Sequence, residues 1–282
     1  MAWADQLGIF ARHAWPCIVS YCYFNAESGD VLHGSFDEAV NMWQVIILQA
    51  DSRKISNKEF ISILHWAEHL ANRMVTAYTS STSHYLWTRL LTPSSIIPHD
   101  TLVIQFVPMG YPNKATVGYL PWGDEPGRHN LRGAKNTEVQ KIAHEISHVL
   151  GILHEHQRWD REQYLKFTCE NVWGYETAVR RCEASEDCDM DMLCTYYGTA
   201  SDLPWTSGRS FTVGNVGDLD SQGPFDFESV MLYSAEGWAD KDECSIEKKA
   251  ESCPLCKRTA DGGLVEMSSS STAASTMATA YL

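Results

Sequence analysis

The chain has 282 residues, with 22 basic and 36 acidic side chains, so its formal net charge is −14. That length suits one large domain or two small ones, and an apolar share of 44% is enough for a packed core. The acidic balance disfavours a nucleic-acid partner, because phosphate binding rewards clustered Lys and Arg. No run approaches the roughly 18 apolar residues that span a bilayer, so we expect no membrane span.

The chain contains nine cysteines, most of them in loop-like sequence of its later half. Such crowding is typical of disulfide-bonded extracellular proteins, whereas residues 1–24 lack the basic and apolar segments of a signal peptide. These two observations disagree, and we favour a secreted protein because of the cysteines. Cys253-x-x-Cys256 is compatible with half a zinc knuckle or a redox pair, but no second pair accompanies it, so a disulfide or free thiols are the preferred interpretation.

The first part of the chain carries signals for three strands and two helices. Residues 17–24 alternate and contain β-formers, which predicts a strand, and apolar residues at helical spacing predict a helix over 36–50. A second helix is expected from Ser56, because its hydroxyl can cap the helix while Glu59 reaches back. Residues 101–107 form a short β-rich run, and residues 115–120 are its expected neighbour.

The Pro- and Gly-rich residues 121–130 break this pattern, and another helix is expected after them. It begins near Thr137, with Gln140 completing a capping box, and ends at Gly151, which suits a left-handed C-terminal position. Residues 180–224 are rich in Gly, Asp, Ser and Cys, so we expect irregular, cross-linked loops there.

Within this helix stands a motif that predicts a metal site. His144 and His148 are four residues apart, so both imidazoles lie on one helix face and can reach one ion. Glu145 lies beside the first ligand, where its carboxylate can contact a metal-bound water without ligating the metal. Gly151 lets the chain turn, so that His154 returns as a third ligand.

Three imidazoles and one open position are the ligand set of a catalytic zinc site, since structural sites usually fill all four positions with Cys and His. Bound zinc lowers the pKa of its water to about 7. Glu145 can then take the water's proton and pass it to the leaving amine. The spacing therefore predicts one Zn²⁺ per chain and hydrolysis of peptide bonds.

The segment HEISHVLGILHEHQRWDRE (144–162) closely resembles the active-site signature of the astacins, a metzincin branch of zinc endopeptidases. The likeness continues past the three histidines through Arg161, which selects this branch among the metzincins. Residues 229–233 resemble the family's Ser-x-Met-x-Tyr turn, and Trp15-Pro16 resembles the opening of a mature domain.

The resemblance implies an α+β fold with two lobes on either side of a cleft. A twisted mixed sheet and two long helices would form the upper lobe, and the lower lobe would be irregular. Met231 would lie beneath the histidines as an apolar base. Tyr233 would be a metal ligand or a donor to the oxyanion, and Glu155 a structural anchor.

On this basis we expect an N-terminal extension over 1–13, an astacin-like catalytic domain over 14–240, a Cys-containing segment over 241–266 and a disordered tail over 267–282. The expected function is a zinc endopeptidase acting on proteins or peptides. The alternative is a catalytically impaired zinc-binding module with a truncated C-terminal lobe, because only about fifty residues follow Tyr233. Oligomeric state, substrate preference and activation remain open.

Overall fold

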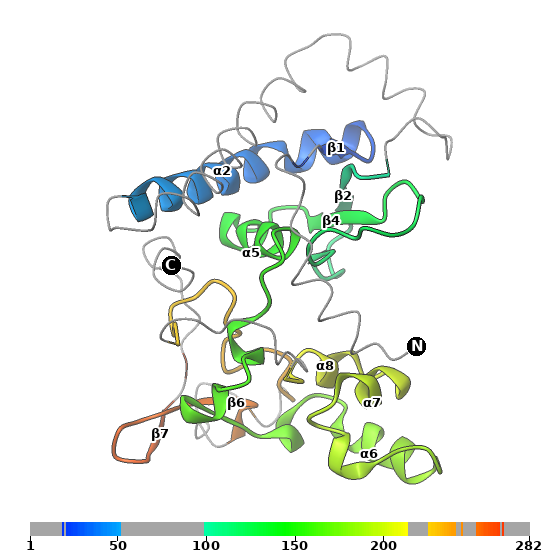
Figure 1. Ribbon diagram of the computed structural model, residues 1–282, viewed down its shortest axis with the longest axis vertical. Coiled ribbons are helices and arrows are strands. Elements are labelled where there is room, and N and C mark those ends of the chain that lie inside the picture. Colours follow the sequence, from blue (N-terminus) through cyan, green and yellow to red (C-terminus); the bar gives the residue numbers. More distant parts are fainter. Residues whose placement is uncertain are drawn as a thin grey trace. The chain divides into compact units, whose positions relative to one another are not determined.

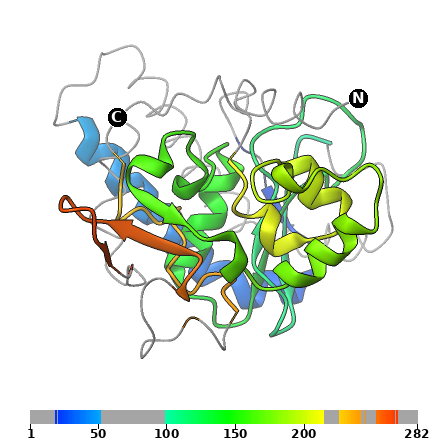
Figure 2. The same ribbon diagram turned by 90° about the horizontal axis from the view of Figure 1, so that it is seen from below.

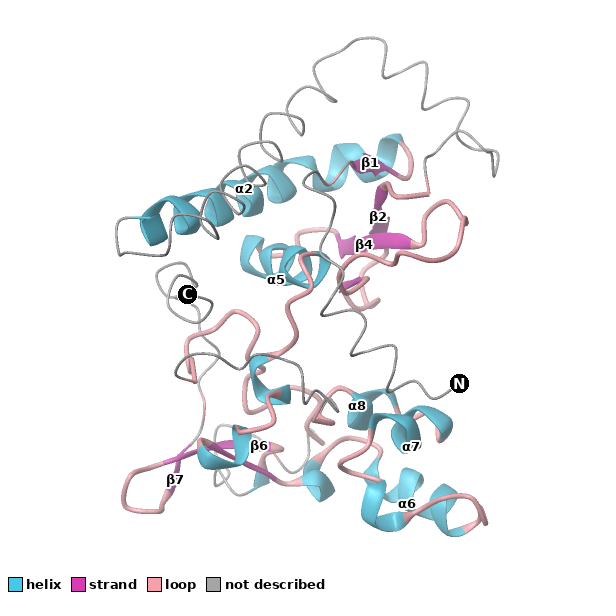
Figure 3. Ribbon diagram, viewed as in Figure 1, coloured by secondary structure: helices cyan, strands magenta, loops and turns pink. Residues whose placement is uncertain are grey.

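The computed structural model describes residue 19, residues 21–51, 99–213, 225–240, residue 244, residues 252–265 and residue 267. They fall into two compact units, one made of the described residues up to 153 and the other of those from 154 onward. Each unit combines helices with a small sheet, so the predicted α+β class is confirmed (Figure 3). The helix expected from Ser56 and nearly all of the expected tail lie outside the described residues.

The first unit is built on a four-stranded mixed sheet of order β1-β2-β4-β3. Strands β1, β2 and β4 run parallel, whereas β3 is antiparallel to β4. The strands are β1 (Tyr21–Tyr23), β2 (Leu102–Val107), β3 (Lys114–Ala115) and β4 (His129–Ala134). The prediction for 101–107 is confirmed, whereas the strand expected over 115–120 is wrong, because the chain turns at Gly118, which has φ +63°.

Strand β4 was missed, because His129 and Asn130 stand in the segment that was expected to break the pattern. Its burial nevertheless alternates, with His129, Leu131 and Gly133 pointing inward. Gly133 is required by close packing, since a Cβ there would lie 3.0 Å from a methyl of Leu32 and 3.1 Å from one of Ile142. The helices that carry Leu32 and Ile142 therefore pack closely on the sheet at Gly133.

Those helices are α2 (Ala26–Asp51) and α5 (Val139–Val149), which pack against each other and against the sheet (Figure 1). The helix expected over 36–50 begins ten residues earlier, because the Asn25 side chain accepts a hydrogen bond from the Ser28 amide and caps it. Trp43 Nε1 donates to the carbonyl of Ala143 at 3.3 Å, which ties the middle of α2 to α5.

The ends of α5 test two local expectations. Gly151 has φ +94° and its amide donates to the carbonyl of His148, so the expected stop is confirmed. The capping box is wrong, because Thr137 Oγ1 donates to the carbonyl of Ala134 and the N-cap residue is Glu138. The hydroxyl of Thr137 closes the preceding turn instead of the helix.

The second unit consists of short elements. They are η1 (Glu155–Gln157), η2 (Arg161–Gln163), β5 (Leu165–Phe167), η3 (Cys169–Asn171), α6 (Tyr175–Glu183), η4 (Met190–Met192), α7 (Tyr197–Asp202), α8 (Thr206–Arg209), β6 (Leu255–Arg258) and β7 (Leu264–Val265). The helices α6, α7 and α8 gather together in both views (Figures 1 and 2). Expecting only loops over 180–224 was therefore wrong for α7 and α8, where Ala200, Leu203 and Trp205 pack into the core.

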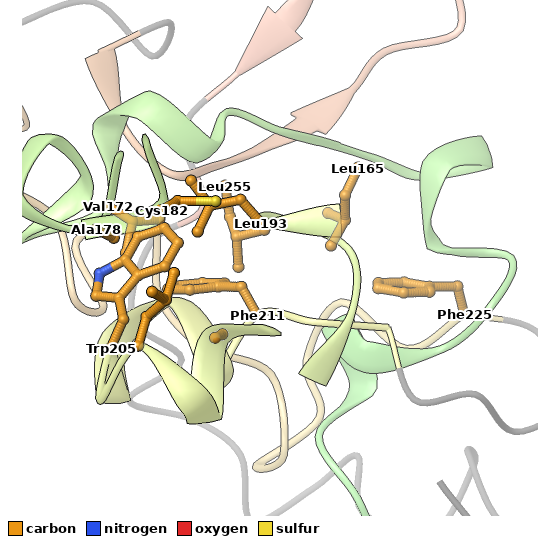
Figure 4. Packing of buried hydrophobic residues seen from close by; sticks show 11 residues of the cluster. Leu165, Val172, Ala178, Cys182, Leu193, Trp205, Phe211, Phe225 and Leu255 are labelled. Carbon is orange, nitrogen blue, oxygen red and sulfur yellow. The ribbon is translucent and has the colours of Figure 1, made fainter. Parts of the chain in front are cut away.

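An apolar cluster and three disulfides hold the second unit together. Trp205, Phe211, Leu193 and Leu255 pack at its centre (Figure 4). The disulfides in the described residues join Cys169 to Cys194, Cys182 to Cys188 and Cys244 to Cys253. Cys253 pairs with Cys244, so the Cys253-x-x-Cys256 pair forms no disulfide of its own.

Candidate metal centre

Helix α5 presents His144 and His148 side by side, with ring centroids 4.7 Å apart and the rings edge to face. The helix buries Ile142, Ala143 and Ile146 within the first unit. Its last turn is also fixed from outside, because the amide of Gly118 donates to the carbonyl of His148 at 2.8 Å. The packed helix therefore presets the positions of both imidazoles.

The hydrogen bond between His148 and Ile152 decides which ring nitrogen of His148 carries the hydrogen and which carries the lone pair. Its Nδ1 lies 2.8 Å from the carbonyl of Ile152. A carbonyl only accepts, so Nδ1 carries the hydrogen and Nε2 keeps its lone pair. Burial, and secondly the neighbouring His144, lower the pKa of His148 to about 3. The ring is therefore neutral at pH 7, as metal ligation requires.

The third histidine follows the turn at Gly151. One ring nitrogen each from His144, His148 and His154 lie within 4.8 Å of one another. This is the one group of three or more possible metal-binding side chains found in the described part of the chain. The structure thus brings together the three histidines that the spacing predicted.

Glu145 is 6% exposed, and its Oε2 is buried without a hydrogen-bond partner among the described residues. Burial raises the pKa of this carboxyl group to about 8, and Lys114 opposes the rise. A cation bound nearby would lower the pKa again, because positive charge stabilises the carboxylate. A buried carboxylate without a partner is costly, which makes Glu145 suited to accept a proton or a hydrogen bond from a ligand.

The Met231 turn is tied directly to the residue after His154. Met231 is 1% exposed, its amide donates to the hydroxyl of Ser229 at 3.1 Å, and its carbonyl accepts from the amide of Glu155 at 3.0 Å. Tyr233 follows in the same turn, and its ring centroid lies 4.5 Å from that of His154. The two sequence motifs, far apart in the chain, therefore meet at the third histidine.

An ion-pair network holds the segment that follows His154. Glu155 is 3% exposed and accepts from Arg158 at 2.9 Å and from the amide of Asp226 at 3.0 Å. Arg158 also pairs with Asp160 through two hydrogen bonds of 2.9 Å. These ion pairs anchor the segment that follows His154 in the chain.

Sequence reasoning missed two neighbours of the third ligand. His154 Nδ1 lies 2.9 Å from Gln157 Oε1, and the ring of His156 stacks on that of His154 with centroids 5.0 Å apart. His156 is fully buried, and its Nδ1 accepts from the amide of Tyr233 at 3.4 Å. The signal was present, because His154 and Gln157 are three residues apart and therefore face each other in a 3₁₀ turn.

The donor set fits zinc. Three neutral imidazoles are the ligands of a catalytic zinc site with one open position, and zinc–nitrogen bonds are about 2.0–2.1 Å long. His148 and His154 each hold their Nδ1 in a hydrogen bond, so Nε2 carries the lone pair that a metal would bind. Glu145, next to His144 in the chain, has a buried oxygen without a hydrogen-bond partner among the described residues and could serve as a base.

One comparison with known proteins matches the part of the chain that carries the three histidines. Residues 123–208 match the family model of the astacin peptidases, which confirms the predicted resemblance for that part of the chain. No curated protein matches the chain. One similar solved structure is high choriolytic enzyme 1, a hatching-enzyme zinc protease from the medaka fish Oryzias latipes, at 16% identity, a TM-score of 0.34, and coverage of 59% of this chain and 62% of that one. The match thus spans less than two thirds of that solved chain.

Proposed function

We propose that the chain is a zinc-dependent endopeptidase, with His144, His148 and His154 as metal ligands and Glu145 as general base. The observation that carries the proposal is the clustering of the three ring nitrogens within 4.8 Å, inside the segment that matches the astacin family model. One Zn²⁺ per chain would be held there. When bound, zinc polarises a peptide carbonyl and makes water acidic enough to attack it at neutral pH.

The residues around the triad would supply the remaining chemistry. Glu145 takes a proton from the attacking water and returns it to the leaving amine, a role that its buried, partnerless oxygen supports. Tyr233 lies against His154, where its hydroxyl can ligate the metal or donate to the developing oxyanion. Met231 and Glu155 hold the turn and the segment that carry Tyr233 and His154, and Gly151 provides the bend.

The substrates would be proteins or peptides, and the compartment an oxidising one outside the cytosol. The second part follows from the three disulfides, which persist in secreted proteins and are rare in reducing compartments. In the part of the chain that the structure describes, no helix is both long and apolar enough to cross a bilayer.

The proposal is tested by replacing Glu145 with Gln in the zinc-loaded protein. Cleavage of an unfolded protein substrate should fall by at least about 100-fold, because general base catalysis contributes that much or more. Zinc content, measured by mass spectrometry, should stay at one per chain. Glu138→Gln is the matched control, since Glu138 is exposed at the start of the same helix and pairs only with Lys141 in an exposed ion pair.

Unchanged cleavage by Glu145→Gln would show that the assigned base is wrong. Failure of the wild-type chain to retain zinc after dialysis would refute the metal site itself. A wild-type chain that holds one zinc but cleaves no peptide in a broad library would instead favour the impaired zinc-binding module.

A further inference from the structure

Gln157 occupies a position that the proposed mechanism does not use. It is the last residue of η1, and its backbone N–H donates to the backbone carbonyl of His154 at 3.0 Å. A 3₁₀ turn has three residues per turn, so side chains three apart lie one above the other. The turn therefore places the Gln157 amide group directly against the imidazole of His154.

The Thr212 carbonyl determines the direction of both side-chain hydrogen bonds of Gln157. Gln157 Nε2 donates to the carbonyl of Thr212 at 3.2 Å, and a carbonyl can only accept. The amide nitrogen therefore faces Thr212, and Oε1 faces His154 Nδ1 at 2.9 Å. Because Oε1 also only accepts, His154 carries its hydrogen on Nδ1, and the lone pair lies on Nε2.

The acceptor at Thr212 is itself held firmly. Three successive carbonyls accept from three side chains of the ligand segment: that of Ser210 from His156, that of Phe211 from Arg161 and that of Thr212 from Gln157. Thr212 and Phe211 are almost completely buried. We call these acceptors the 210–212 carbonyls. The three hydrogen bonds together hold residues 156–161 against the 210–212 carbonyls, so the acceptor of Gln157 is fixed in position.

Resting on the proposed zinc site, we propose that Gln157 is a positioning residue that sets the tautomer and ring orientation of His154. It does so by hydrogen bonding to the Thr212 carbonyl through Nε2 and to His154 Nδ1 through Oε1. The other tautomer carries its hydrogen on Nε2 and cannot bind a metal through that atom. His156, stacked on the same ring, limits its tilt but donates to Ser210 instead of to His154. The hydrogen bond to Gln157 thus favours the tautomer of His154 that can bind a metal through Nε2.

The test measures zinc affinity by competition with a chelator, which needs no enzymatic activity. Gln157→Leu removes both hydrogen bonds and should weaken zinc binding about 10- to 100-fold, the effect usual for a lost partner of a metal-bound histidine. Gln157→Glu keeps an acceptor for His154 Nδ1 and should bind zinc within a few-fold of wild type. Gln163→Leu is the control, because Gln163 is exposed in the neighbouring turn η2.

Two variants separate positioning from a merely structural role. In Gln157→Glu a carboxylate faces the Thr212 carbonyl, so the metal-free protein should unfold at lower urea than wild type while its zinc affinity survives. If zinc affinity instead falls equally in the Glu and Leu variants, or in neither, the positioning role is wrong. If wild type itself binds no zinc, the proposed function fails and not this inference alone.

Discussion

The three histidines of the candidate metal site stand in two regions that are held in different ways. His144 and His148 stand on α5, a helix packed on α2 and on a four-stranded sheet. His154 stands on irregular chain, held by its hydrogen bond with Gln157, the Glu155 ion pair and the Met231 turn. Regular secondary structure thus fixes two of the candidate ligands through packing, whereas the third depends on hydrogen bonds to its neighbours from residues as distant in the chain as Met231.

The difference teaches how a small site obtains a third direction of approach. A single helix can offer ligands only along one face, so a third imidazole has to arrive on chain that has left the helix. Such chain lacks the internal hydrogen bonds of a helix, and each of its side-chain contacts becomes important for the geometry. We therefore expect the two regions to respond differently to covalent, electrostatic and backbone changes.

The largest expected difference comes from reducing the disulfides. All three in the described residues lie between 169 and 253, within the second unit. Loop entropy predicts a loss of about 3 kcal/mol for Cys169–Cys194 and about 2 kcal/mol for Cys182–Cys188. Under a reductant, amide hydrogen exchange should rise sharply over residues 155–212 and little over α2, β2 and β4.

Paired Cys→Ser variants make the comparison quantitative. The Cys169/Cys194 pair closes 25 residues and the Cys182/Cys188 pair closes 6, so the first double variant should lose about 1 kcal/mol more in urea unfolding. Equal loss of protection in both units would contradict the claim that the cross-links support only the irregular region.

The same difference separates what the sequence could predict from what it could not. The α5 motif follows from local rules, since a four-residue spacing and a terminal glycine act within one or two turns. The irregular region follows from contacts such as Arg161 to Phe211 and Asp226 to Glu155, which join positions 50 and 71 residues apart. A single sequence carries no local signal for such pairs.

Two errors within the first unit have the same origin. Strand β4 was missed because His129 reads as polar loop sequence, yet it is fully buried and its Nε2 accepts from the amide of Leu120 at 2.8 Å. Thr137 satisfies every rule for a helix cap, but its hydroxyl is already donated to Ala134. In both cases a hydrogen bond to a residue outside the predicted segment overrode the local preference.

His129 gives the sheet region its own pH dependence. Burial lowers the pKa of this imidazole to about 4, with further effects from Arg128, His99 and Asp100. The unfolded chain, with a pKa of about 6.5, binds the proton first, so stability is fully present above about pH 6.5 and is lost as pH falls towards 4. The loss should reach about 3 kcal/mol at most, because each pKa unit is worth about 1.4 kcal/mol.

The check is urea unfolding between pH 4 and pH 7 for wild type and His129→Gln. The glutamine oxygen can still accept from Leu120 but does not titrate, so the variant should lose less stability than wild type across this range. Parallel curves for the two proteins would mean that His129 does not carry this pH dependence.

The smallest expected effect lies at Gly151, where the chain leaves α5. An alanine Cβ there would find ordinary contact, 3.8 Å from Gly118 Cα, so space is not the obstacle. The obstacle is φ +94°, which should make Gly151→Ala cost about 1–2 kcal/mol in urea unfolding.

Gly34→Ala is the matched control, because Gly34 lies within α2 and an added Cβ meets nothing within 4 Å. That change should stabilise the protein by about 0.5–1 kcal/mol, since alanine favours the helix. The two glycines thus predict opposite signs for one substitution. If Gly151→Ala were neutral or stabilising, the bend before His154 would not require a left-handed residue, and the third ligand would owe its place to the hydrogen bonds of its own segment alone.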